Sequence, residues 1–393
     1  FTYGVVVGVY KFFPYQVLQD VKCKLNNTCS VSPVFQNQLK FDKPDYDGSW
    51  VPVVQTQTGL ELTEITPDEE ILNSFIFSWV RIEDDNIEQA SALKFKDGSI
   101  YYINRQDPQI LSQLGLSDEN LPAKAGVRAV FDFQGQTLAY VAYVEENCVT
   151  AKLVSLGTNE TLLDLGCIDV DEANLDLVGG GHLVLNENEF LIAIGTGTAH
   201  TVGNQYNQNA QHDESYWGKI LKFSFVEGSH KVSVYSKGHR NPQGMFARKG
   251  KIYAVEHGPR GGDEINEISE ANNYGWPKQS LGSETDGTPI NKSTEDIPNY
   301  VDPLYAFIPS IGISDINECP QSYSNYYQPY KCLAVSSMRA GAIFFLVFND
   351  NRILFTERMD FESRIRKIVI DGDRVIAVTD YEGVIVGEMR PIY

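Results

Sequence analysis

Two polar loops carry residue types that could bind a charged ligand. The loop GHRNPQG (238–244) contains Arg240 and Asn241, and the loop EHGPRGGDEIN (256–266) contains Gly258 and Pro259. Binding groups are often found in such loops at strand ends. Because glycine and proline also shape ordinary turns, each loop alone could be a turn whose charged side chains pair with one another. Two such loops a few residues apart favour a functional site.

Three further arginines could complete a basic pocket with Arg240. Arg364 and Arg366 are two residues apart, so they would face the same side of a strand. Arg339 stands in the run SSMRAG (336–341). A guanidinium can bind a carboxylate through two parallel hydrogen bonds, so this set suits a ligand with carboxylates. Any one of these arginines could equally be a solvated charge on a strand.

The overall charge makes such a cluster unusual in this chain. Lys plus Arg number 32 against 52 Asp plus Glu, which gives a net charge of −20. A field of that sign repels nucleic acid and anionic lipid, so we expect no nucleic-acid partner. No apolar run approaches the ~20 residues of a membrane-spanning helix. The chain has no GxSxG motif, which argues against a hydrolase of that type.

The elements that would position these loops are short strands. Among 393 residues there are 21 Tyr, 20 Phe and 32 Gly, a composition that leans toward strands and turns. A unit of turn, strand, polar loop and second strand recurs, as at Gly98, Gly135 and Gly250. The sequence therefore predicts an all-β fold of repeated antiparallel sheets, and a β-propeller is favoured over a pair of β-sandwiches. The few helices predicted are short, as at residues 107–114.

Residues 1–45 differ from the rest of the chain, since an apolar and aromatic stretch is followed by a polar one. We expect an N-terminal arm here and a single propeller domain over residues 46–393. The arm could follow a removed signal peptide or a membrane tether before residue 1, and it could mediate self-assembly.

The cysteines and glycosylation motifs predict export to the periplasm, the cell surface or the extracellular space. Six cysteines fall in three pairs that are close in sequence, and three Asn-x-Ser/Thr motifs are present. Free thiols in a cytosolic protein remain the alternative. The candidate disulfides are Cys23/Cys29, Cys148/Cys167 and Cys319/Cys332, and the candidate glycosylation sites are Asn26, Asn159 and Asn291.

The two loops, followed by NYGWP (273–277), closely resemble the soluble glucose, aldose-sugar and sorbosone dehydrogenases that depend on pyrroloquinoline quinone (PQQ). The resemblance extends forward to Arg364, Arg366 and Asp380 and fades backward near Leu93. It implies a six-bladed β-propeller of four-stranded antiparallel blades. It also implies oxidation of a small sugar or other alcohol, with hydride passed to the quinone.

The resemblance assigns roles to the residues named above. Arg240 with Asn241, Arg339, and Arg364 with Arg366 would surround the quinone and its carboxylates. The backbone carbonyls of Gly258 and Pro259 would bind a calcium ion that contacts the quinone. A hard cation held by oxygen ligands would polarise the carbonyl that accepts hydride.

One position departs from the family pattern. The family's general base is a histidine, and Val178 stands at that position, with Leu177 where the family has an acidic residue. Valine cannot accept a proton. His182 is a weak candidate for the base, because it would reach the site only if the loop 179–181 rearranged. The sequence thus leaves two hypotheses: a PQQ- and calcium-dependent sugar dehydrogenase, or a catalytically degenerate propeller that acts as an extracellular structural, assembly or carbohydrate-binding module.

Overall fold

The computed structural model describes residues 51–52, 68–198, 205–284, 286–290, 300–350 and 352–392. The described chain is dominated by strands, and its α-helices are short: α4 (Pro108–Gln113) and α5 (Gln321–Tyr326). The helix predicted near residue 107 is therefore confirmed. No helix in these ranges is long and apolar enough to cross a membrane. Short 3₁₀ segments are η2 (Asp118–Asn120), η3 (Leu175–Leu177) and η4 (Gln205–Ala210).

In the described ranges the strands form six sheets, in which hydrogen-bonded neighbours are antiparallel. Three sheets have four strands in sequence order. They are β11 (Gly179–Asn186), β12 (Glu189–Ile194), β13 (Lys219–Val226) and β14 (Ser229–Lys237); β15 (Pro242–Arg248), β16 (Lys251–Glu256), β17 (Asp263–Ile268) and β18 (Tyr305–Phe307); and β19 (Ile313–Glu318), β20 (Lys331–Ser337), β21 (Ala342–Asn349) and β22 (Arg352–Asp360).

The other three sheets depart from that pattern. One has three strands and two have five, and the last combines strands from both ends of the described chain. They are β1 (Val51–Pro52), β5 (Ser99–Asn104) and β4 (Ala90–Lys96); β6 (Gly126–Phe133), β7 (Gln136–Glu145), β8 (Cys148–Ser155), β9 (Thr161–Asp164) and β10 (Ile168–Asp169); and β2 (Asp68–Leu72), β3 (Phe75–Ile82), β25 (Val384–Pro391), β24 (Arg374–Thr379) and β23 (Ile365–Asp371).

The recurring unit predicted from sequence is a tight hairpin. Lys96 pairs with Ser99, and Phe133 pairs with Gln136, so each turn has two residues. Both residues of each turn have positive φ, which is +51° and +79° at Asp97 and Gly98. Such turns match the right-handed twist of the strands they join, and glycine adopts this backbone conformation without strain.

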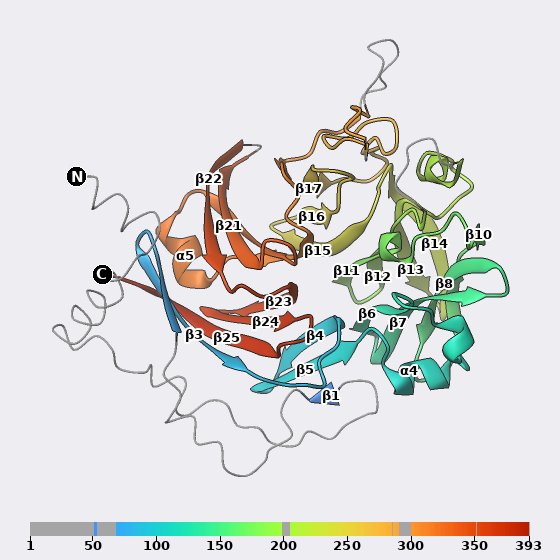
Figure 1. Cartoon of the computed structure of the whole chain (residues 1–393), viewed down its shortest axis with the longest axis horizontal. Helices are drawn as coiled ribbons and strands as arrows, with labels where there is room; N and C mark the ends of the chain where they lie inside the picture. The colour runs from blue at the N-terminus through green and yellow to red at the C-terminus, as the bar shows by residue number, and fades with distance from the viewer. Residues whose placement is uncertain are drawn as a thin grey trace.

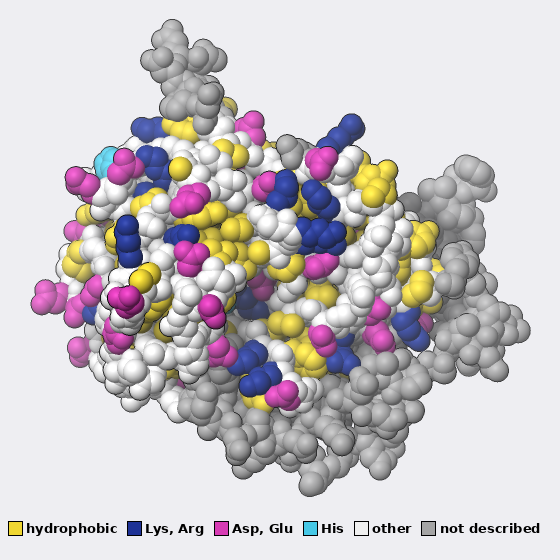
Figure 2. Space-filling view, turned by 180° about the vertical axis from the view of Figure 1, so that it is seen from behind, with side chains coloured by type: hydrophobic (Ala, Val, Ile, Leu, Met, Phe, Trp, Pro, Cys, Tyr) yellow, Lys and Arg dark blue, Asp and Glu magenta, His cyan; other side chains and the backbone are white. Residues whose placement is uncertain are grey.

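One strand from each of the six sheets faces a common axis, and we call these β4, β6, β11, β15, β19 and β23 the axial strands (Figure 1). β4 contacts β6, β6 contacts β11, and the series continues through β15, β19 and β23 back to β4. Apolar clusters fill the space between neighbouring sheets, as between β7 and β12. The prediction of an all-β, propeller-like fold of antiparallel sheets is confirmed. Viewed from behind, the molecule is hollowed near its middle, with Lys and Arg side chains beside the hollow (Figure 2).

Two of the three predicted disulfides are present, Cys148–Cys167 and Cys319–Cys332. Such bonds persist in oxidising compartments, so they fit an exported protein. Of the candidate glycosylation sites, Asn159 is exposed at the turn between β8 and β9. Cys23, Cys29, Asn26 and Asn291 lie outside the described residues.

Candidate functional site

The predicted ligand-binding residues lie at one end of the axis. In an antiparallel pair, the start of the first strand lies beside the end of the second. Arg240 and Asn241 precede β15, and Gly258 follows β16, the second strand of the same sheet. In the next two sheets, Arg339 follows β20 and Arg364 precedes β23. Strand order and direction therefore bring residues that are far apart in sequence to the same end.

Arg364 and Arg366 share one carboxylate. The Nε of Arg366 donates to Oδ1 of Asp380 at 2.6 Å, and the Nε of Arg364 donates to Oδ2 at 2.7 Å. Asp380 is only 2% exposed, whereas the Arg364 side chain is 53% exposed. The prediction that the two arginines face the same side is confirmed. Because each Nε is engaged, each guanidinium can direct its outer nitrogens toward a ligand.

Arg240 is buried at 4% exposure and is held on several sides. Its Nη1 donates to the carbonyl of His257 at 2.9 Å, and its guanidinium lies 5.3 Å from the ring centre of Trp276. Its backbone N–H donates to Oε2 of Glu256 at 2.8 Å. Burial lowers the pKa of Arg240 to about 10, while the charge of Asp263 opposes that shift. Arg240 therefore remains a cation at neutral pH in a fixed position.

Asn241 ties three segments together. Its side-chain carbonyl accepts from the backbone N–H of Gly179 at 3.1 Å, and its amide donates to the carbonyl of Asp176 at 3.0 Å. The same amide nitrogen lies 3.1 Å from Nδ1 of His257. Burial lowers the pKa of His257, so its imidazole is neutral near pH 7. Asn241 thus fixes the loop before β11 to the loop after β16.

The loop that carries Gly258 and Pro259 is anchored by Asp263. One oxygen of this carboxylate accepts from the N–H of Gly258 at 3.2 Å, and the other accepts from the N–H groups of Gly312 and Ile313 at 2.7 and 3.0 Å. In the described part of the chain, no backbone hydrogen bond uses the carbonyls of Gly258 and Pro259. Those two oxygens are therefore available as ligands for a cation.

A half-buried carboxylate with a raised pKa lies next to this loop. Burial raises the pKa of Glu264 to about 8, and the charge of Glu256 acts in the same direction. Asn266 donates to Oε2 of Glu264 at 3.4 Å and to Oε1 of Glu256 at 2.8 Å. Glu264 is therefore largely protonated at neutral pH.

Arg339 is exposed at the rim of this end. Its neighbour Met338 contacts Arg364, whose Nη2 lies 3.7 Å from the sulfur. The sequence therefore identified arginines that the fold gathers from three different sheets.

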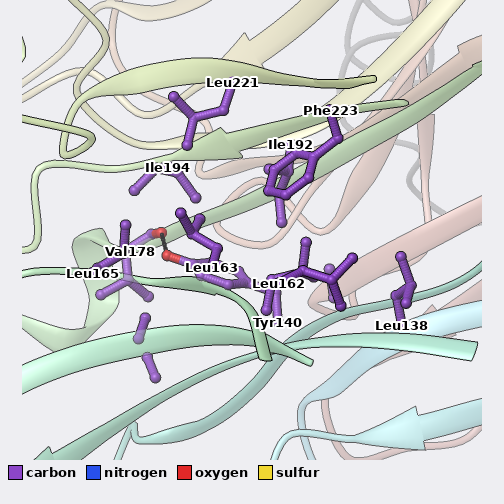
Figure 3. Close-up of a cluster of buried hydrophobic side chains, with 14 of the residues drawn as sticks. Leu138, Tyr140, Leu162, Leu163, Leu165, Val178, Ile192, Ile194, Leu221 and Phe223 are labelled. Atoms are coloured by element: carbon purple, nitrogen blue, oxygen red, sulfur yellow. Dashed lines mark hydrogen bonds between the residues drawn. The ribbon is translucent and has the colours of Figure 1, made fainter. Parts of the chain in front are cut away.

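Val178 does not face the cluster of arginines. Its side chain is fully buried in the apolar cluster between two sheets, among Tyr140, Leu163 and Ile194 (Figure 3). Its carbonyl accepts a hydrogen bond from the hydroxyl of Tyr140 at 3.0 Å. Leu177 before it is also buried. This position contributes packing and no ionisable group.

His182 lies farther along β11, in a cavity on the axis. The cavity has a volume of about 170 Å³, and each of the six axial strands contributes to its lining. Burial lowers the pKa of His182 to about 4, and its ring stacks on Phe131 with centres 4.6 Å apart. Representative lining residues are Ser91, Val130, His182, Met245, Asp315 and Lys367.

Two buried arginines at the same end were missed by the sequence reasoning. Arg105 follows β5 and Arg128 is the third residue of β6, and each is 8% exposed. Burial lowers the pKa of both, and the charge of Arg366 acts in the same direction, so the three groups lie in one region. The available signal was an arginine inside the apolar run GVRAVF (126–131), since a charge there requires a buried partner.

Comparison with known proteins agrees with this arrangement. The family described as glucose / sorbosone dehydrogenase matches residues 96–386. The aldose sugar dehydrogenase YliI of Escherichia coli is 33% identical over 132 residues, which are 30% of this chain and 34% of that protein. Quinoprotein glucose dehydrogenase B of Acinetobacter calcoaceticus is 30% identical over 146 residues, 33% of this chain and 30% of that protein. The chain thus spans about a third of the length of these curated relatives.

Solved structures share the fold over a longer range. A crystal structure of a glucose dehydrogenase has a TM-score of 0.62 at 21% identity and covers 79% of this chain and 98% of its own. The soluble aldose sugar dehydrogenase from Escherichia coli, in the apo-form, has a TM-score of 0.62 at 18% identity and covers 80% of this chain and 99% of its own. The family match spans most of the described strands and includes Arg240, Asn241, Arg339, Arg364 and Arg366. The chain belongs to the glucose / sorbosone dehydrogenase family.

Proposed function

We propose that this chain is an exported oxidoreductase that binds PQQ and calcium and oxidises a sugar or a related alcohol. In this proposal the six sheets are the blades of one six-bladed propeller within residues 46–393. The observation that carries the proposal is that Arg240, Arg339, Arg364 and Arg366 stand at one end of the axis although they come from three sheets. These arginines are the group of hydrogen-bond donors that we predicted from sequence to bind the carboxylates of the quinone.

The residues present fit a tricarboxylate cofactor. Asp380 engages only the Nε atoms of Arg364 and Arg366, so an outer nitrogen of each guanidinium could meet ligand oxygens while Nη2 of Arg364 lies against the sulfur of Met338. The exposed Arg339 makes no side-chain ion pair within the described residues. Bidentate pairing of guanidiniums with carboxylates would both neutralise and orient the ligand.

The residues also fit a calcium ion bound by carbonyl oxygens. Asp263 fixes the loop so that Gly258 and Pro259 keep their carbonyls free of backbone hydrogen bonds in the described ranges. Calcium prefers such oxygen ligands. No group of three or more His, Cys, Asp or Glu side chains in these ranges could hold a metal, so carbonyls would supply the main contacts.

When bound, the quinone supplies a hydride acceptor, and the protein's residues bind and orient the reactants. Arg240 and Asn241 hold the loops on either side of the site, and the guanidinium of Arg240 stays charged at neutral pH. Val178 offers no proton acceptor. His182 remains a candidate for the general base only from its position in the axial cavity. Its low pKa keeps the imidazole neutral there.

A second candidate function is a binding module that retains the scaffold and does not catalyse. The burial of Val178 in the core favours it, because the position of the family's base is committed to packing. Residues 1–45 could then serve assembly, which stays a prediction.

Titration of the calcium-loaded protein with PQQ tests the first proposal. We expect a bound-quinone absorbance change at micromolar PQQ and its loss in Arg364→Ala. Dye-linked oxidation of aldoses by the reconstituted protein then separates the two functions. Activity that survives His182→Ala supports a dehydrogenase with another proton acceptor, whereas PQQ binding with no activity supports the binding module. No PQQ binding rejects the first proposal.

A further inference from the structure

Arg105 and Arg128 are buried cations whose partners are almost all uncharged. The Nη2 of Arg128 donates to the carbonyls of Leu175, at 2.6 Å, and Lys124. Nη1 of Arg105 lies 4.0 Å from Oδ1 of Asp176, which is a loose ion pair. The Nε atoms of both arginines are buried with no hydrogen-bond partner in the described part of the chain. Two guanidiniums thus lie within the protein with spare donors.

The nearby carboxylates are already engaged by other cations. Asp176 accepts from Nζ of Lys124 at 2.6 Å, and Asp380 pairs with both Arg364 and Arg366. The charges of these two carboxylates favour the charged form of Arg105, and among the described residues no other carboxylate is found to do so. Five cations therefore share two carboxylates in this region, and an excess of positive charge remains.

Such an excess is costly inside a protein unless an anion compensates it. A buried charge that lacks a partner loses its hydration without recovering the free energy elsewhere. Burial and the charge of Arg105 lower the pKa of Arg128 well below its usual range, which is the expected sign of this cost. A carboxylate or phosphate bound here would relieve it.

The position of the group points to the substrate. Leu175 and Asp176 lie three and two residues before Val178, the position that corresponds to the family's proton acceptor. Asn241 joins the carbonyl of Asp176 to the loop of Arg240. Lys124, with a side chain 55% exposed, makes the group accessible from solvent.

We infer that Lys124, Arg105 and Arg128 form an anion subsite distinct from the four arginines assigned to the cofactor, and that the substrate is a sugar carrying a carboxylate or a phosphate. The substrate assignment rests on the proposed function, whereas the subsite does not. An anionic sugar would place its acidic group on these cations and its reacting carbon toward the loop of Val178.

Calorimetric titration of PQQ-free protein at low salt with D-glucuronate, glucose 6-phosphate and D-glucose tests the inference. We expect the anionic sugars to bind at least tenfold more tightly than D-glucose and to weaken as salt is added. Arg105→Gln and Lys124→Gln should each weaken anionic-sugar binding about tenfold to a hundredfold. The exposed Arg352, on β22, provides the control Arg352→Gln, which should change nothing. Lys124→Gln is informative even if a buried arginine variant fails to fold.

The outcomes separate the subsite from the cofactor site. Equal affinity for neutral and anionic sugars, or binding that only Arg364→Ala abolishes, would overturn the inference. A parallel loss of PQQ affinity and sugar affinity in Lys124→Gln would also overturn it, because the cations would then belong to the cofactor site. Anionic-sugar binding in a protein that does not bind PQQ would support the subsite and reject the proposed cofactor.

Discussion

The guanidinium of Arg366 is bound to the carboxylate of Asp380 through Nε and Oδ1, which lie 2.6 Å apart. The other oxygen of Asp380 holds Arg364, so one nearly inaccessible carboxylate sets the separation of two arginines that we propose bind the cofactor. Neither arginine needs to be reorganised when a ligand with carboxylates arrives. The site is therefore preorganised by a residue that would not itself touch the ligand.

Replacement of this carboxylate should weaken both stability and ligand binding. Asp380→Asn removes the charge that pairs with two guanidiniums and should lower the free energy of unfolding by about 2 kcal/mol. PQQ should bind about tenfold more weakly, because the arginines lose their fixed orientation. Urea denaturation and PQQ titration measure the two effects. Asp350→Asn, at an aspartate whose side chain is 82% exposed, should alter neither. Unchanged PQQ affinity in Asp380→Asn would contradict the role assigned to this residue.

Installing a histidine at the family's base position should not restore a base. The side chain of Val178 points into the apolar cluster, so Val178→His would bury an imidazole among leucines and isoleucines. We expect the free energy of unfolding to fall by about 2 kcal/mol or more, with no gain in dye-linked activity. Thermal unfolding and the dye-linked assay measure these effects, with Val184→His as the matched change at a residue 43% exposed. A gain in activity would show that position 178 can face the site.

Stability should depend on pH through Glu264. The folded protein holds this proton up to about pH 8, whereas the unfolded chain releases it near the ordinary pKa of 4.5. Between these values the folded state binds more protons than the unfolded state, so the free energy of unfolding falls as pH rises. The slope from one proton is at most about 1.4 kcal/mol per pH unit.

Urea denaturation from pH 5 to pH 7 measures this slope. Glu264→Gln should make the dependence flatter, whereas Glu88→Gln, at an exposed carboxylate, should leave it unchanged. A wild-type slope that the Glu264 variant preserves would place the responsible group elsewhere.

The disulfide Cys148–Cys167 should contribute substantially to stability. It closes a loop with a sequence separation of 19 residues, for which chain-entropy arguments give about 3 kcal/mol. The double variant Cys148→Ser/Cys167→Ser should lose about this amount in urea denaturation under non-reducing conditions. If reductant left the free energy of unfolding of the wild type unchanged, the bond would not be formed in solution.

Much of the fold was predictable because its signals are local. Two-residue turns such as Asp97-Gly98 mark where one strand of a hairpin leads into the next. The two-residue spacing of Arg364 and Arg366 predicts that both face one side. The arginines at one end of the axis could be singled out from sequence because the family motifs are long and ordered.

The remainder depends on contacts that sequence does not encode locally. Arg105 and Arg128 were missed because their role follows from the meeting of β5 and β6 with the loop before β11. The inward orientation of Val178 depends on packing against Tyr140, which is 38 residues away. Strand patterns also gave no indication that β3 would join the last sheet, since any strand edge offers the same hydrogen-bonding groups.

The last sheet joins strands from the two ends of the described chain. β3 pairs with β25 along its whole length, from Phe75 opposite Pro391 to Ile82 opposite Val384. This pairing closes the ring of sheets. Bringing together strands so far apart in sequence costs conformational entropy, which other contacts of the fold must offset. Arg364 and Arg366 lie at the start of β23, which belongs to this closing sheet, whereas Arg240 precedes β15 of a different sheet. In the proposed function, a cofactor whose carboxylates bind Arg240 on one side and Arg364 with Arg366 on the other would bridge two sheets of the ring, and its binding free energy would add to the stability of the folded protein.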